Sequence, residues 1–128
     1  MLGAGNIARS FAQDVQRREG MVVTAVASRS QGKADQFAHD LQVVRTYNSY
    51  EALAAADIDV VYIATPHVFH CEQSLLCLEA GKPILVEKPF MMNADEAARV
   101  MAMAREKRLF CMEAMWMRFI PAMQKRLR

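Results

Sequence analysis

The sequence predicts an α/β fold in which helices cover both faces of a parallel sheet. Three features favour this fold. Short apolar runs rich in β-branched residues alternate along the chain with segments whose apolar residues recur at helical spacing. These helical segments carry start and stop signals at their ends. A glycine-rich turn, GAGNIA at residues 3–8, opens directly into the first of them.

Five runs have the character of strands. The first, MVVTAVAS, is β-branched and nearly continuous, as expected of a strand that is covered on both faces. The five runs lie at residues 21–28, 43–47, 59–65, 83–89 and 109–114. Because helical segments separate them, we expect parallel strands in a doubly wound sheet, which binds its ligands at the carboxyl ends of the strands.

The helical segments are defined by their apolar spacing and by their ends. The first ends at Gly20 and repeats its apolar residues at helical spacing: Ile7, Ala8, Phe11, Ala12 and Val15. A second, at residues 68–80, ends at Gly81. A third opens with Asn93 and places Glu96 three residues later, in an arrangement that resembles a capping box.

Composition is typical of a globular protein of one domain. The chain has 128 residues, of which 53% are hydrophobic and 23% charged, and a formal net charge of only +2. That charge gives no reason to expect nucleic acid or membrane partners, and no apolar run has the length of a membrane span. The first residues carry no secretory signal and the three cysteines form no C-x-x-C pair, so we expect a cytoplasmic protein.

The turn at residues 3–8 has the pattern G-x-G-x-x-A, formed by Gly3, Gly5 and Ala8. Gly3 permits a tight turn, Gly5 lets a pyrophosphate approach the backbone, and Ala8 lets the helix pack closely on the sheet. The helix that begins at Asn6 and Ile7 then presents free N–H groups and the positive end of its dipole. The sequence therefore predicts a Rossmann-like, dinucleotide-binding fold.

The strand that should precede this turn is short. Only Met1 and Leu2 come before the glycines, whereas the pattern normally follows a complete strand. That strand is central in a doubly wound sheet. We therefore expect a truncated first strand and unpaired backbone groups on its neighbours.

The end of the run at residues 21–28 bears on the choice of nucleotide. Enzymes specific for NAD usually carry Asp or Glu there, which binds the ribose 2′-hydroxyl. This chain has Ser28, Arg29 and Ser30 instead, and an arginine pairs with a 2′-phosphate that a carboxylate would repel. We therefore predict NADP as the cofactor in preference to NAD. The alternative is that Arg29 is a surface residue before a helix capped by Ser30.

The chain resembles the Gfo/Idh/MocA family of NAD(P)-dependent oxidoreductases in four segments: GAGNIA, ATPHVFH, GKPILVEKP and MEAMWMRFIPA. The last segment, together with YNSYEALA, is most similar to the branch of dihydrodiol and D-xylose dehydrogenases. The resemblance implies a dinucleotide-binding domain over residues 1–114 and, at 115–128, the start of a junction to a second α/β domain that the chain lacks. It also implies that the proton-transfer residue lies beyond Arg128.

The resemblance gives the catalytic role to Lys88. Its ammonium would stabilise negative charge on the reacting oxygen during hydride transfer. The resemblance further implies that Glu87 helps to fix this lysine and that Pro89 shapes the backbone beside the nicotinamide. Taken alone, Lys88 is also compatible with a solvated strand end.

A second loop, formed by Thr65, Pro66 and His67, matches the part of the family that lines the ribose and nicotinamide side of the cofactor. His70 matches a histidine at the start of the next helix, where packing or capping explains it as well as a role in cofactor binding does. The two histidines are metal-ligand types, but no partner pair elsewhere completes a tetrahedral set, so we expect no metal.

Three further residues, Trp116, Arg118 and Phe119, match positions near the substrate and the domain junction. The alternative is an amphipathic final helix that packs its apolar residues inward: Trp116, Phe119, Ile120, Met123 and Leu127. An uncovered apolar surface here would favour self-association.

Two functions compete. The first is an NADP-dependent oxidoreductase, present as its nucleotide-binding domain, that transfers a hydride between nicotinamide and a hydroxyl-bearing carbon of a sugar or cyclic diol. The isolated chain is then expected to be inactive and its full-length relatives to be homo-oligomers. The second is a catalytically inactive nucleotide-binding fragment or regulatory module. Short-chain dehydrogenases are disfavoured, because none of Tyr47, Tyr50 and Tyr62 precedes a lysine by four residues.

Overall fold

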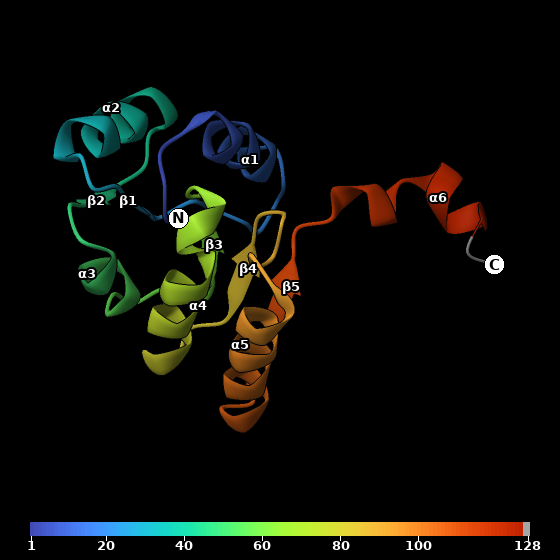
Figure 1. Ribbon diagram of the computed structural model, residues 1–128. Coiled ribbons are helices and arrows are strands. Elements are labelled where there is room, and N and C mark those ends of the chain that lie inside the picture. Colours follow the sequence, from blue (N-terminus) through green and yellow to red (C-terminus); the bar gives the residue numbers. More distant parts are fainter. Residues whose placement is uncertain (127–128) are drawn as a thin grey trace.

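The computed structural model describes residues 1–126, and its strands and helices alternate in the predicted order (Figure 1). Short parallel strands lie at Ala25–Ala27 (β1), Arg45–Tyr47 (β2), Val61–Ile63 (β3), Ile84–Val86 (β4) and Cys111–Glu113 (β5). Each lies inside one of the runs that the sequence assigns to strands. The predicted α/β architecture is therefore confirmed, although every strand is shorter than its run.

The strands form one twisted sheet through the first residues of the chain. β1 pairs with β2, and β4 lies between β3 and β5, all in parallel. Leu2 connects the two sets, because it bridges Ala27 in β1 and Ile63 in β3. The resulting order is β2, β1, Leu2, β3, β4, β5, which is a doubly wound sheet with Leu2 at its centre.

The first strand is short, but the backbone groups beside it are paired. Leu2 donates to the Tyr62 carbonyl at 2.8 Å and accepts from the Ala64 N–H at 2.9 Å, and Ala27 exchanges an equivalent pair with the residues on either side of Leu2. The expectation of unpaired groups is wrong at this level of the sheet, because two residues are enough to reach both neighbours. Nearer the amino ends of β1 and β3, before Met1, the space between the two strands is a cavity of about 440 Å³.

Helices fill the connections between the strands. Within residues 1–126 they are Asn6–Gln16 (α1), Gln31–Leu41 (α2), Tyr50–Ala54 (α3), His70–Glu79 (α4), Ala94–Glu106 (α5) and Pro121–Arg126 (α6), with 3₁₀ turns at His67–Phe69 and Trp116–Phe119. Both N-caps expected from the sequence are confirmed. The Ser30 hydroxyl accepts from the Lys33 N–H, and the Asn93 side chain accepts from the Glu96 N–H.

Two hydrophobic cores lie on opposite faces of the sheet. Figure 1 shows α1 and α2 on one side of the strands and α3, α4 and α5 on the other. Phe37 of α2 is fully buried on one face of the sheet, and Leu53 and Leu78 are fully buried on the opposite face. The interpretation of α1 holds except for Ile7, which is 51% exposed at the start of the helix and is therefore not a core residue.

Beyond β5 the chain runs away from the sheet (Figure 1). Trp116, Phe119 and Met123 are 64%, 60% and 37% exposed, so the alternative of an inward-packed final helix is wrong for these three residues. Leu127, which that alternative also included, lies outside the described residues. None of the helices within residues 1–126 combines the length and the apolar character that crossing a membrane requires.

Candidate functional site

The first loop of the chain lies at the carboxyl ends of β1 and β3, and Gly3 contacts both ends. Its N–H donates to the Ala27 carbonyl at 2.9 Å, at the end of β1. Its φ is +96°, and a Cβ there would lie 2.8 Å from the Ala64 carbonyl oxygen, just after β3. The fold therefore requires a glycine at position 3, because of its positive φ and because a side chain there would collide with the Ala64 carbonyl.

Gly5 differs from Gly3, because nothing in the protein requires a glycine there. Its backbone is extended, with φ −85° and ψ −173°, and a Cβ would meet no atom within 4 Å. Gly5 is also the N-cap of α1, which has no side-chain cap and no acidic residue in its first turn. The free N–H groups of α1 thus face open space, which suits an anionic ligand such as a pyrophosphate.

Lys88 is exposed just after β4, and the neighbouring Glu87 is fixed by two hydrogen bonds. The Glu87 carboxylate accepts from the Tyr62 hydroxyl at 2.5 Å and from the Lys88 backbone N–H at 3.1 Å. Burial, followed by the Glu87 carboxylate, raises the pKa of the Tyr62 phenol, which keeps it a donor. Within residues 1–126 no ion pair joins Glu87 to the Lys88 ammonium, so Glu87 fixes the backbone of the lysine and not its charge. The Lys88–Pro89 peptide bond is cis.

His70 is 1% exposed and lies beneath the site, where it joins two of its loops. Its Nε2 is 2.9 Å from the Thr65 carbonyl oxygen and its Nδ1 is 2.9 Å from the Pro89 carbonyl oxygen. Both partners can only accept, so the doubly protonated ring satisfies both contacts and a neutral ring satisfies one. Pro66 and His67, between these residues, are exposed at the surface.

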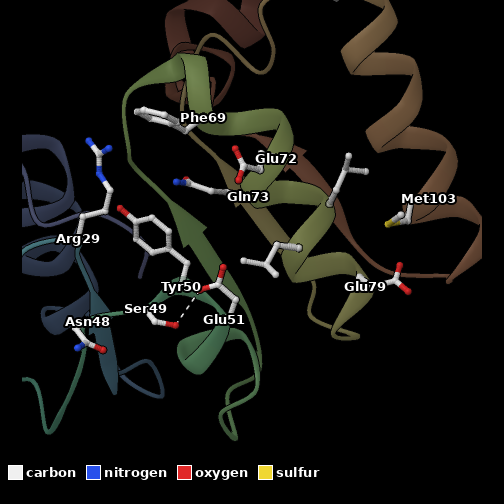
Figure 2. Close-up of a pocket in the computed structure, with 12 residues that line it drawn as sticks. Arg29, Asn48, Ser49, Tyr50, Glu51, Phe69, Glu72, Gln73, Glu79 and Met103 are labelled. Carbon is white, nitrogen blue, oxygen red and sulfur yellow. Dashed lines mark hydrogen bonds between the residues drawn. The ribbon is translucent and has the colours of Figure 1, made fainter.

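Arg29 lies beside the loops, at the edge of a cavity of about 680 Å³ (Figure 2). Its side chain is exposed, and its guanidinium carbon is 4.8 Å from the centre of the Phe69 ring. The hydroxyl of Ser28, the preceding residue, accepts from the Ser30 N–H at 3.2 Å. The site therefore offers a cation next to the end of β1, where a carboxylate would stand in an NAD-specific fold.

Several residues that shape the site were not anticipated from the sequence. Tyr62 holds Glu87, and Phe69 contacts Arg29. Gln73 accepts from the Thr65 hydroxyl at 2.5 Å, and Glu113 accepts from the Phe90 N–H at 2.8 Å, which ties the loop after β4 to β5. Each acts through a tertiary contact with a residue 8 to 40 positions away, because the sheet brings together segments that are distant in the chain.

The predicted substrate-proximal residues do not join the loops. Trp116, Arg118 and Phe119 occupy an exposed 3₁₀ turn in the segment after β5, which leaves the sheet (Figure 1). Within the described part of the chain, no three His, Cys, Asp or Glu side chains are grouped so that they could hold a metal ion.

Known proteins are similar to this chain in sequence and in fold. The model of an oxidoreductase family with an NAD-binding Rossmann fold, GFO_IDH_MocA, matches residues 1–115. Trans-1,2-dihydrobenzene-1,2-diol dehydrogenase of Mus musculus is 43% identical over 97% of this chain and 38% of its own length. D-xylose 1-dehydrogenase (NADP(+)) of Hypocrea jecorina is 34% identical over 94% of this chain and 34% of its own length.

A solved structure has the same fold as this chain. A 3-ketoreductase from Actinomadura kijaniata, in complex with TDP-benzene and NADP, matches 97% of this chain and 40% of its own with a TM-score of 0.90 and 32% identity. The chain thus spans about two fifths or less of the length of these relatives. The predicted branch is confirmed by the dihydrodiol and D-xylose dehydrogenases among them. This chain belongs to the Gfo/Idh/MocA oxidoreductase family and carries its NAD(P)-binding Rossmann domain.

Proposed function

We propose that this chain is the cofactor domain of an NADP-dependent dehydrogenase that acts on a hydroxyl-bearing carbon of a sugar or cyclic diol. The observation that carries the proposal is the position of two features at one edge of the sheet. The open N-terminus of α1 at Gly5 lies after the central position of the sheet, and the exposed Lys88 lies after β4. The relatives named for a dihydrodiol and for D-xylose support the substrate class.

The residues around this edge fit a dinucleotide. The backbone of Gly3, Gly5, Asn6 and Ile7 would hold the pyrophosphate, because the N–H groups of α1 are free and no side chain fills the space before them. We assign the ribose and nicotinamide side to the loop at residues 65–67, with His70 beneath it. The bound nicotinamide would supply or accept the hydride.

Lys88 would act on the substrate. Its ammonium is exposed, and within residues 1–126 it forms no ion pair, so it is available to donate a hydrogen bond to the reacting oxygen. Such a cation stabilises the negative charge that develops on that oxygen when hydride leaves or arrives at the carbon. Glu87 and Pro89 would position Lys88 beside the nicotinamide. We assign Trp116, Arg118 and Phe119 to the substrate side of the junction.

We propose NADP as the cofactor because Arg29 follows β1 where NAD enzymes carry a carboxylate. A guanidinium presents several N–H donors in a fixed plane and pairs strongly with phosphate oxygens. The relative named for NADP(+) and the structure solved with NADP support this choice. We further propose a cytoplasmic location, where the three free cysteines would stay reduced, and homo-oligomers for the full-length relatives.

A nucleotide-binding module without turnover is the competing proposal. Calorimetric titration of NADP and NAD into the chain, and into Arg29→Ala, tests the part that both share. We expect NADP to bind at least about tenfold more tightly than NAD, and Arg29→Ala to abolish that difference. Binding of neither nucleotide would overturn both proposals.

Turnover tests a further point, whether the chain is an enzyme by itself. We expect the 128-residue chain to show no NADP-dependent oxidation of D-xylose or of trans-1,2-dihydrobenzene-1,2-diol, while it still binds the nucleotide. Oxidation of either compound by the purified chain would show that it is an enzyme by itself. Loss of that oxidation in Lys88→Met, with unchanged NADP affinity, would then assign Lys88 to the chemical step.

A further inference from the structure

Phe69 and Arg29 come from different parts of the chain and form a cation–π pair at the edge of the proposed cofactor site. Arg29 directly follows the loop residue at the end of β1, and Phe69 ends the 3₁₀ turn His67–Phe69 after β3. The guanidinium carbon lies 4.8 Å from the centre of the Phe69 ring, and both residues line the cavity of about 680 Å³ (Figure 2). Phe69 is half-buried, so its ring is held by the fold while Arg29 is exposed.

From this geometry we infer that Phe69 is a positioning residue for Arg29, and that it sets how strongly the site prefers a nucleotide with a 2′-phosphate. The inference rests on the proposed function. It concerns a residue that touches the arginine and not the reacting atoms. An arginine that is already oriented loses less conformational freedom when it binds a phosphate than one that is free to rotate.

The contact places the guanidinium carbon over the Phe69 ring and engages none of the hydrogen-bond donors of Arg29. A cation over an aromatic ring is attracted by the negative face of the ring, so the contact uses none of the five N–H donors. Within residues 1–126 the Arg29 guanidinium donates no hydrogen bond and forms no ion pair. Its N–H donors therefore have no partner within the described residues and are available to a phosphate.

The Phe69 ring competes with nearby carboxylates for the Arg29 guanidinium. Glu51, Glu72 and Glu79 line the same cavity and would attract a free guanidinium. Glu51 accepts from the Ser49 hydroxyl at 2.9 Å, as Figure 2 shows, and Glu79 lies 3.7 Å from the Lys107 ammonium. Glu72 has no such partner in the described part of the chain, and the contact with Phe69 holds Arg29 in a position where it does not pair with it.

A double-mutant cycle on Arg29 and Phe69 tests this role. Calorimetric titration would give the affinities for NADP and NAD in the wild type, Phe69→Leu, Arg29→Ala and the double variant. We expect Phe69→Leu to reduce the NADP preference about two- to fivefold, which is the exposed cation–π range of about 0.5–1 kcal/mol converted at about 1.4 kcal/mol per tenfold. In the Arg29→Ala background the same change should leave the ratio of affinities unaltered.

Two controls separate positioning from packing. Phe69→Tyr keeps an aromatic face and should keep the preference, and Val68→Ala changes an exposed neighbour in the same turn without touching the cation–π pair. Thermal unfolding of each variant confirms that the fold is retained. A general effect of Phe69 on nucleotide packing would change both affinities together and so cancel in their ratio.

The outcomes are distinct. A ratio that falls in Phe69→Leu only when Arg29 is present supports the inference. A ratio that is insensitive to Phe69→Leu, or equally sensitive in both backgrounds, overturns it while the NADP proposal stands. Equal NADP and NAD affinities in the wild type overturn the cofactor preference and this inference together, and binding of neither nucleotide overturns the proposed function itself.

Discussion

The hydroxyl of Tyr62 donates a hydrogen bond to the carboxylate of Glu87 at 2.5 Å, and this contact ties the centre of the sheet to the residue before Lys88. The Tyr62 ring stacks on Phe11 of α1, with ring centres 3.8 Å apart. One side chain therefore links α1, β3 and the end of β4. This link fixes the position of the proposed catalytic loop relative to the helix whose N-terminus faces the proposed pyrophosphate.

Removing the Tyr62 hydroxyl should weaken the protein. Tyr62→Phe keeps the stacked ring but leaves the Glu87 carboxylate one donor short, and a hydrogen bond to a charged group contributes about 1.5–3 kcal/mol. We expect the free energy of unfolding in urea to fall by about that amount. Tyr50→Phe is the matched control, since the Tyr50 hydroxyl has no hydrogen bond within residues 1–126. Equal losses in the two variants would contradict this role.

The two glycines of the first turn should respond in opposite ways to the same substitution. Gly3→Ala places a Cβ 2.8 Å from the Ala64 carbonyl oxygen at a positive φ, so we expect the chain to unfold or to lose several kcal/mol of stability. Gly5→Ala meets no atom within 4 Å and should keep its melting temperature. Its Cβ would instead stand before the N–H groups of α1, and we expect nucleotide affinity to fall at least about tenfold.

Thermal melting and NADP titration on both glycine variants check this difference. A Gly5→Ala chain that binds NADP as tightly as the wild type would contradict the placement of the pyrophosphate at α1. A Gly3→Ala chain with wild-type stability would contradict the close approach of the first loop to Ala64.

His70 should matter for stability more than its neighbour His67. His70→Leu removes the ring that lies between the Thr65 and Pro89 carbonyls and donates to at least one of them, and leaving a buried acceptor without a partner costs about 1–3 kcal/mol. We expect a loss of at least about 1–3 kcal/mol in urea unfolding. The exposed His67, replaced by Ala, should change stability by no more than about 0.5 kcal/mol. If His70→Leu left the free energy of unfolding unchanged, the two loops would hold their positions without the ring.

The order of the elements was predictable, because it depends on local patterns. Strand runs, caps and glycine spacing are read from neighbouring residues, and each pattern fell on the predicted element. The roles of individual side chains were less predictable. Glu87 was expected to fix the lysine, but its carboxylate bonds the backbone of Lys88 and the hydroxyl of Tyr62, 25 residues earlier.

The errors have the same cause. Ile7 fits the helical spacing of α1, yet it lies in the first turn of the helix and is 51% exposed. The final segment has the spacing of an amphipathic helix, but spacing does not say whether a surface exists to receive the apolar side chains. Trp116 and Phe119 have none within the described residues and stay exposed.

Those exposed side chains should make the chain associate. Trp116 and Phe119 lie in one 3₁₀ turn, with Met115 and Met117 also exposed beside them. Burial of such apolar area stabilises association by about 25 cal/mol per Å². We expect sedimentation velocity to show concentration-dependent association, and the double variant Trp116→Ser, Phe119→Ser to reduce it. Replacing the exposed Val44, near the β2 edge of the sheet, with Ser should leave the association unchanged. Equal association of the wild type and both variants would show that the chains associate through another surface.

The stability of the chain should depend on pH through two buried groups, the Met1 α-ammonium and the Cys77 thiol. Burial lowers the pKa of the Met1 α-ammonium from 8.0 to about 5, an effect that Cys77 partly opposes. Burial also raises the pKa of the Cys77 thiol to about 12. The folded protein therefore favours the neutral form of both groups.

The sign of each effect follows from proton binding. Between about pH 5 and 8 the unfolded chain holds a proton at Met1 that the folded chain does not, so stability rises with pH by at most about 1.4 kcal/mol per unit. Above about pH 9 the unfolded chain releases the Cys77 proton and the folded chain keeps it, so stability falls. Urea unfolding as a function of pH should show a maximum near pH 8–9.

Acetylation of Met1 provides the control for the acid side of this profile. The acetyl group cannot take up the proton, and the cavity of about 440 Å³ beside Met1 has room for it. The acetylated chain should therefore lose the rise between pH 5 and 8 while it keeps the fall above pH 9, to which the raised pKa values of Cys71 and Cys111 also contribute. If the unmodified chain were equally stable at pH 6 and pH 8, Met1 would not be a buried neutral amine, because only a folded state that rejects the proton gives the slope.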